Sequence, residues 1–115
     1  MNSAFEGTWA DLRSRLRVGA IIRNWSADSG YTGGEFRIND MDSSAIVVRS
    51  PQMGPERSVS RRDFEKLFAL WSQYNRGSVS RAELGKHSQN TTYVLSIPRW
   101  LEDARDGDQA LRPIR

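Results

Sequence analysis

The spacing between apolar residues changes twice along this sequence, and these changes limit the folds open to the chain. Near the start an apolar residue recurs every three or four positions, the period of one face of an α-helix, at Phe5, Trp9, Leu12 and Leu16. In residues 35–40, EFRIND, apolar and polar residues alternate, as they do in a half-buried strand. The helical period returns after residue 60, at Phe64, Leu67, Phe68, Trp71 and Tyr74. We therefore expect a helix, then strands, then helices.

Strand patterns fill the middle of the chain. Four segments are rich in β-branched residues or alternate in polarity, and they cover residues 20–25, 35–40, 44–50 and 56–60. The connectors SADSGYTGG, DMDS and PQMGP contain the residues that form turns. The predicted fold class is therefore α+β, with an N-terminal helix, a small antiparallel meander of three or four strands, and two or three C-terminal helices.

Capping patterns mark where the C-terminal helices begin. Ser60 precedes a predicted helix whose first turn contains Asp63, and Ser80 with Glu83 forms a capping box. A last helix is predicted from apolar positions at Tyr93, Val94, Ile97 and Leu101. Pro98 is expected to bend that helix because proline removes a backbone hydrogen bond.

The length of the chain suits one domain. With 115 residues it can bury a core, and we expect residues 1–102 to form a single domain. The polar segment 103–115, DARDGDQALRPIR, is predicted to be a flexible tail. No apolar run approaches the roughly 18 residues of a membrane-spanning helix, so no membrane partner is expected. The sequence contains no cysteine, which fits the cytoplasm as the expected location.

Few residues are suited to catalysis or metal binding. His87 is the only histidine and there is no cysteine, so the sequence excludes thiolate metal sites and histidine clusters. The glycine motifs of nucleotide-binding loops are missing, and Gly33-Gly34 is typical of a turn. We therefore expect a protein that is not an enzyme and has no cofactor. A pair of carboxylates that the fold brings together is the alternative left open.

The net charge is +3, from 17 basic and 14 acidic residues, and fifteen of the basic residues are arginine. Arginine binds phosphate and carboxylate groups alike. The surplus would assist binding to nucleic acid, but it is also typical of an ordinary protein surface.

The segment NWSADSGYTGGEF, residues 24–36, is long for a hairpin connection and contains Trp25 and Tyr31. Long loops that carry aromatic residues often form binding surfaces, and arginine contributes strongly at the centre of interfaces. We therefore expect Trp25, Tyr31 and Arg37 to bind a partner, either another protein or a second copy of the chain. The alternative is that both rings fold back over an edge of the core.

Residues 78–102 support a second hypothesis. VSRAEL, residues 79–84, resembles the support helix of winged-helix DNA-binding regulators, and NTTYVLSI, residues 90–97, resembles their recognition helix. This resemblance implies nucleic-acid contacts from Arg81, Lys86, Asn90, Thr91 and Thr92. In the competing interpretation the two helices only close the core.

Three phrases carry a broader resemblance: GAIIRNWSADSGYTGGEF, SRRDFEKLFALWSQYNRG and SQNTTYVLSI. They resemble short uncharacterised bacterial proteins encoded on mobile gene cassettes, a resemblance that implies no known activity or site. From the sequence we expect a non-enzymatic binding module that interacts with another protein, with nucleic-acid binding as the alternative.

Overall fold

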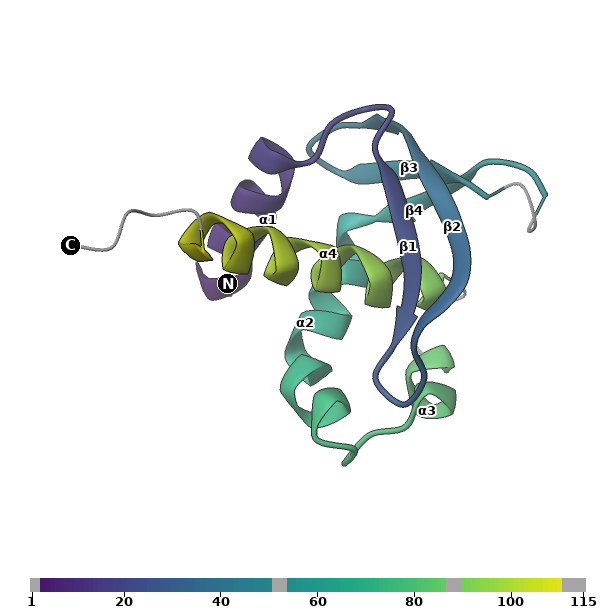
Figure 1. Cartoon of the computed structure of the whole chain (residues 1–115), viewed down its shortest axis with the longest axis vertical. Helices are drawn as coiled ribbons and strands as arrows, with labels where there is room; N and C mark the ends of the chain where they lie inside the picture. Colours follow the sequence, from purple (N-terminus) through teal and green to yellow (C-terminus); the bar gives the residue numbers. More distant parts are fainter. Residues whose placement is uncertain (1–2, 51–53, 87–89, 111–115) are drawn as a thin grey trace.

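The computed structural model describes residues 3–50, 54–86 and 90–110 of the chain. It has the predicted α+β architecture, with an N-terminal helix, an antiparallel sheet and C-terminal helices (Figure 1). In chain order the elements are α1 (Ser3–Arg15), β1 (Ile21–Ser26), β2 (Gly30–Met41), β3 (Ala45–Arg49), β4 (Arg57–Ser60), α2 (Arg61–Asn75), α3 (Arg81–Gly85) and α4 (Thr91–Ala110).

The strands form an antiparallel meander in the order β1-β2-β3-β4, so β1 and β4 are its edges. Successive side chains of a strand point to opposite sides of the sheet. One side packs against the helices and holds the buried residues Ile22, Phe36, Ile38, Ile46, Val48 and Val59. The other side, which we call the outer face, carries Ile21, Glu35, Arg37, Asn39 and Arg49.

Helix α4 packs against β1 on the buried side of the sheet and forms the centre of the core (Figure 1). Residues 93–97 are all buried. The ring of Tyr93 contacts the ring of Phe36 edge-on, with centroids 4.8 Å apart. A helix this deeply buried must be apolar around most of its circumference, which agrees with the run YVLSI.

A side-chain hydrogen bond fastens β1 to α4. The Ser96 hydroxyl accepts a hydrogen bond from the backbone N–H of Trp25 at 2.9 Å and donates one to the Thr92 carbonyl at 2.7 Å. The pairing of β1 with β2 is irregular at this point, between Arg23 and Trp25. Ser96 therefore satisfies a strand N–H that the irregular ladder leaves free.

Strand β2 is longer than the sequence predicted. We expected a strand at 35–40 after a long loop, but β2 begins at Gly30, so most of the predicted loop belongs to the two strands of a hairpin. Gly33 has a φ of +91°, a conformation that glycine adopts readily and that permits the bulge in this hairpin.

Helices α1 and α2 complete the core with aromatic contacts. The Phe5 and Phe68 ring centroids lie 5.6 Å apart, and those of Trp9 and Phe64 lie 5.4 Å apart. The predicted caps are also present. The Ser60 hydroxyl accepts a hydrogen bond from the N–H of Asp63 at 3.2 Å, and Ser80 with Glu83 forms the capping box of α3.

Helix α4 continues past the predicted end of the domain. We expected a flexible tail from residue 103, but the helix extends to Ala110, with Pro98 in its interior. Residues 111–115, the rest of the predicted tail, lie outside the described residues.

Two contacts explain this correction. The Tyr31 hydroxyl donates a hydrogen bond to the Asp103 carboxylate, and the Arg105 guanidinium donates to the Asp11 carboxylate of α1 at 2.8 and 2.7 Å. A polar segment that the sequence alone suggests is free is therefore anchored to β2 and α1.

Candidate functional site

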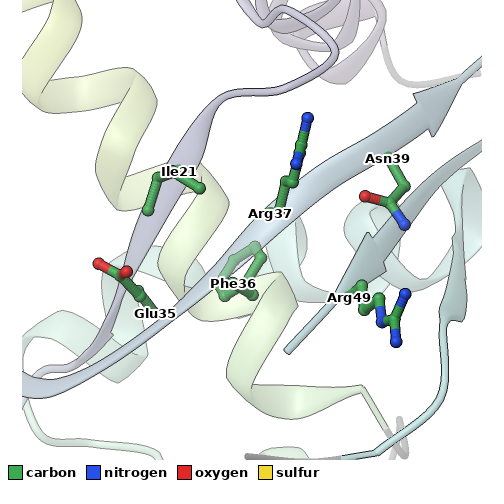
Figure 2. Close-up of a pocket in the computed structure, with 6 residues that line it drawn as sticks. All are labelled: Ile21, Glu35, Phe36, Arg37, Asn39 and Arg49. Atoms are coloured by element: carbon green, nitrogen blue, oxygen red, sulfur yellow. The ribbon is translucent and has the colours of Figure 1, made fainter. Parts of the chain in front are cut away.

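The outer face carries three side chains that lie opposite one another on adjacent strands. Arg37 of β2 is the Cα partner of Ile21 on β1 and of Arg49 on β3. Directly opposed residues point to the same side of a sheet. Figure 2 shows these side chains around an open pocket of about 480 Å³, which is lined by Ile21, Glu35, Phe36, Arg37, Asn39 and Arg49.

Two guanidinium groups border this pocket, those of Arg37 and Arg49. Neither Arg37 nor Arg49 forms an ion pair with any described residue. Like charges directly opposite on neighbouring strands destabilise a sheet. An anionic group from outside the chain would therefore be favoured between these two arginines.

Apolar surface adjoins the charged pocket. Ile21 is 51% exposed, and Val18, just before β1, is 58% exposed. On the other side of the pocket the Asn39 amide donates a hydrogen bond to the Glu56 carboxylate at 2.7 Å. A shallow surface that combines arginine with exposed aliphatic side chains is suited to a protein partner, whereas small molecules favour enclosed pockets.

The expectation that Trp25 contributes to a contact surface is wrong. Its side chain is only 9% exposed. The indole packs against the rings of Trp71 and Tyr74, with centroids 5.8 and 6.3 Å away, and the Arg99 guanidinium covers it at 5.2 Å. Trp25 is a core residue because this end of β1 packs onto α2 and α4.

Tyr31 fits partly with a contact surface and partly with a ring that folds back over the core. Its ring is 40% exposed, and the Arg23 guanidinium lies 4.4 Å from the ring centroid. The hydrogen bond to the Asp103 carboxylate, with burial as a second cause, raises the pKa of the Tyr31 hydroxyl above its usual value. Tyr31 therefore ties β2 to α4 while leaving part of its ring accessible. Of the three predicted contact residues, only Arg37 lies in the pocket on the outer face.

Of the residues predicted to contact nucleic acid, Thr91 is buried, and Arg81, Asn90 and Thr92 form hydrogen bonds within the fold. Thr91 is 7% exposed. The Asn90 amide donates to the Asp63 carboxylate of α2 at 3.3 Å, and Arg81 donates to the Thr92 hydroxyl at 2.8 Å. The segment compared with a recognition helix is the buried centre of the molecule, so the exposure that a DNA-reading helix requires is missing at Thr91.

Arg81 and Lys86 are both exposed, at the two ends of α3, and Arg81 is held by its hydrogen bond to Thr92. That helix has only five residues. Residues 87–89, which include the single histidine, lie outside the described residues.

Three residues of the pocket, Ile21, Asn39 and Arg49, were not singled out from the sequence. The alternation in EFRIND already placed Glu35 and Arg37 on the side opposite Phe36, and Asn39 extends that alternation. Arg49 carries no such signal because its position opposite Arg37 depends on the pairing register of β2 with β3.

No group of three or more acidic or histidine side chains among the described residues could hold a metal ion. Asp11 and Asp42 both have a lowered pKa, Asp11 mainly through Arg15 and Asp42 mainly through the N–H of Ser44. A lowered pKa keeps a carboxylate ionised, which is the opposite of what a general acid requires. Of the helices in residues 3–50, 54–86 and 90–110, none is long and apolar enough to cross a membrane.

No protein-family model matches this sequence, and no curated protein or solved structure matches it either.

Proposed function

We propose that this protein is a non-enzymatic binding module that recognises another protein through the outer face of its sheet. The observation that supports this most is the cross-strand pair of Arg37 and Arg49, which has no ion-pair partner among the described residues and lies beside exposed Ile21. Arginine and exposed apolar side chains contribute much of the binding energy at protein interfaces. The absence of cysteine suits a module that works in the cytoplasm.

A protein partner fits this face better than nucleic acid does. Glu35 lies on the same face, and a continuous row of phosphates would have to pass it, whereas a protein can place an uncharged residue opposite it. Modules that bind single strands stack the bases on exposed aromatic rings. Among the described residues that line the pocket, the single aromatic one is Phe36, which is 1% exposed and faces the core.

The proposal is tested by affinity capture from the host cell with the tagged protein and a double variant, Arg37→Glu with Arg49→Glu. We expect the variant to capture at least about tenfold less of the protein partner. Glutamate in place of the two interface arginines would repel the groups that the arginines attract. The matched control is Arg62→Glu with Arg76→Glu, which makes the same charge change on exposed residues at the two ends of α2.

The captured material is quantified by mass spectrometry, and circular dichroism establishes that both variants fold. Equal capture by wild type and the double variant would rule out the outer face as the binding surface. If nuclease treatment abolished the capture, the partner would be nucleic acid and the proposal of a protein partner would be wrong.

A further inference from the structure

Strand β1 is an edge of the sheet, and part of its backbone has no hydrogen-bond partner within the described parts of the chain. The Ala20 carbonyl accepts a hydrogen bond from the N–H of Ile38 at 2.9 Å. Hydrogen-bonded positions in an antiparallel pair recur every second residue, so Ile22 bonds to β2 as well. The backbone N–H and C=O groups of Ile21 and Arg23 therefore point away from β2, and no hydrogen bond joins them to another described element.

This free edge is bounded on both sides. Before it, the Ala20 N–H donates to the Arg17 carbonyl at 3.0 Å. After it, the Trp25 N–H donates to Ser96 of α4. The two unpaired residues between these points offer donors and acceptors in the spacing that one added strand requires.

A cleft of about 180 Å³ lies beside the same edge, between β1 and α4. Ile22 and Trp100 supply an apolar wall, and Trp100 is partly buried against the core. The cleft is lined by Ile21, Ile22, Arg23, Tyr31, Ser96 and Trp100. Alternate side chains of a strand along β1 would enter this cleft, and the others would lie on the outer face.

Side chains of an added strand that point to the outer face would lie near two arginines, Arg23 and Arg37. The Arg23 guanidinium lies over the Tyr31 ring and forms no ion pair with a described residue. Arg37 reaches toward the start of β1, since a Cβ placed on Gly19 would lie 3.9 Å from its Nη2 atom. Glu35, the Cα partner of Arg23, is acidic, but Arg23 and Arg37 together outweigh its charge. Acidic side chains are therefore favoured near the two arginines of this side of an added strand, and apolar ones on the side of the cleft.

We propose that the partner binds as an extended segment that alternates acidic and apolar residues and adds a fifth strand along β1. This inference rests on the proposed function and specifies the class of partner and the way it binds. Backbone pairing with Ile21 and Arg23 supplies affinity, and the two rows of side chains supply specificity.

A second copy of the chain is the less favourable occupant of this edge. Each copy has a net charge of +3 and brings its own Arg23 and Arg37 to the joint. Pairing two such edges places cations near cations, whereas an acidic segment neutralises them.

The experiment uses a short synthetic peptide that alternates glutamate and valine, with the full-length protein labelled for NMR. We expect the backbone amides of Ile21 and Arg23 to shift on titration and to become protected from hydrogen exchange. A matched peptide with lysine in place of glutamate should bind at least about tenfold more weakly.

The decisive variant is Arg23→Pro, compared with Arg23→Ala. Proline is tolerated on an edge strand where its missing N–H faces away from the sheet, so both variants should fold. Both lack the guanidinium, but only proline lacks the backbone donor. We therefore expect the proline variant to bind the peptide at least about tenfold more weakly than the alanine variant.

Equal affinity of the two variants would overturn strand addition, and so would peptide-induced shifts confined to another surface or no binding at all. Should Arg23→Pro not fold, protection of the Ile21 and Arg23 amides in the wild-type protein decides the matter. If these amides became more protected from hydrogen exchange as the protein concentration rises without peptide, the edge would bind a second copy of the chain. The proposal of an acidic partner would then be wrong. If Arg23→Pro still captured the cellular partner and the Arg37→Glu, Arg49→Glu double variant did not, strand addition would be wrong and the proposed function would stand.

Discussion

The indole of Trp25 is surrounded by two other rings and a guanidinium, so its contribution is to packing. We expect Trp25→Ala to lower the free energy of unfolding by about 3–5 kcal/mol, because the variant loses buried surface and leaves a cavity. Urea denaturation at neutral pH measures the change. The control is Val18→Ala, at an exposed position, where a change within about 0.5 kcal/mol is expected. If the Trp25 variant were as stable as this control, the Trp25 ring would not contribute to the core.

The residue scale also explains why Trp25 could not be placed from the sequence. Trp25 and Tyr31 lie in the same glycine-rich segment and are Cα partners in the hairpin, yet one is buried and the other is 40% exposed. Their difference depends on Trp71 and Tyr74 of α2, which cover one ring and are distant in sequence. Composition and local spacing contain no information on that contact.

At the scale of elements, one serine joins β1 to α4. The Ser96 side chain is 1% exposed and accepts the hydrogen bond from the Trp25 N–H. Ser96→Ala leaves that N–H buried without a partner, and we expect a loss of about 1–3 kcal/mol in the free energy of unfolding. Ser72→Ala, at an exposed position of α2, is the control for removing a helical hydroxyl.

Chemical denaturation of both serine variants measures the difference. Hydrogen exchange of the Trp25 amide adds a local measurement, because this proton should exchange faster in Ser96→Ala. If the two variants were equally stable and the amide equally protected, another group would have to satisfy the strand at this point.

Element positions were largely predictable, whereas their register was not. The change of period located helices and strands, and alternation alone placed Glu35 and Arg37 on the face opposite Phe36 and Ile38. The opposition of Arg37 to Arg49 follows from the register of β2 with β3, which includes an irregularity between Ile38 and Asp40. No residue pattern within either strand encodes that pairing, so half of the candidate site emerged only from the fold.

At the scale of the whole molecule, the end of α4 holds separate elements together. Asp103 binds Tyr31 of β2, and Arg105 binds Asp11 of α1. We expect a chain that ends at Glu102 to be about 1–2 kcal/mol less stable than a chain that ends at Ala110, which keeps both contacts. Thermal unfolding of the two chains measures this difference, and equal melting temperatures would support the predicted end of the domain at residue 102.

The ion pairs of Asp11, first with Arg15 in its own helix and then with Arg105 of α4, should also make stability depend on pH. Hydrogen bonds from Arg15 are the main cause of the lowered pKa of Asp11, and Arg105 contributes to it against the opposing effect of burial. A lowered pKa in the folded state means that the folded protein favours the ionised carboxylate. Asp11 therefore adds stability above its unfolded-state pKa of 3.8, and this contribution is lost as the pH falls through the lower folded-state value.

Asp11→Asn should accordingly be less stable than wild type at neutral pH, and the difference should shrink as the pH falls below 3.8. Urea denaturation over a series of pH values measures it. Asp42 titrates in both proteins, so its own contribution cancels in the comparison. Asp28→Asn, at an exposed residue of the turn between β1 and β2, controls for the loss of one surface charge. A difference that stays constant with pH would show that the Asp11 side chain acts through packing, and the charge link from α1 to the end of α4 would then contribute nothing.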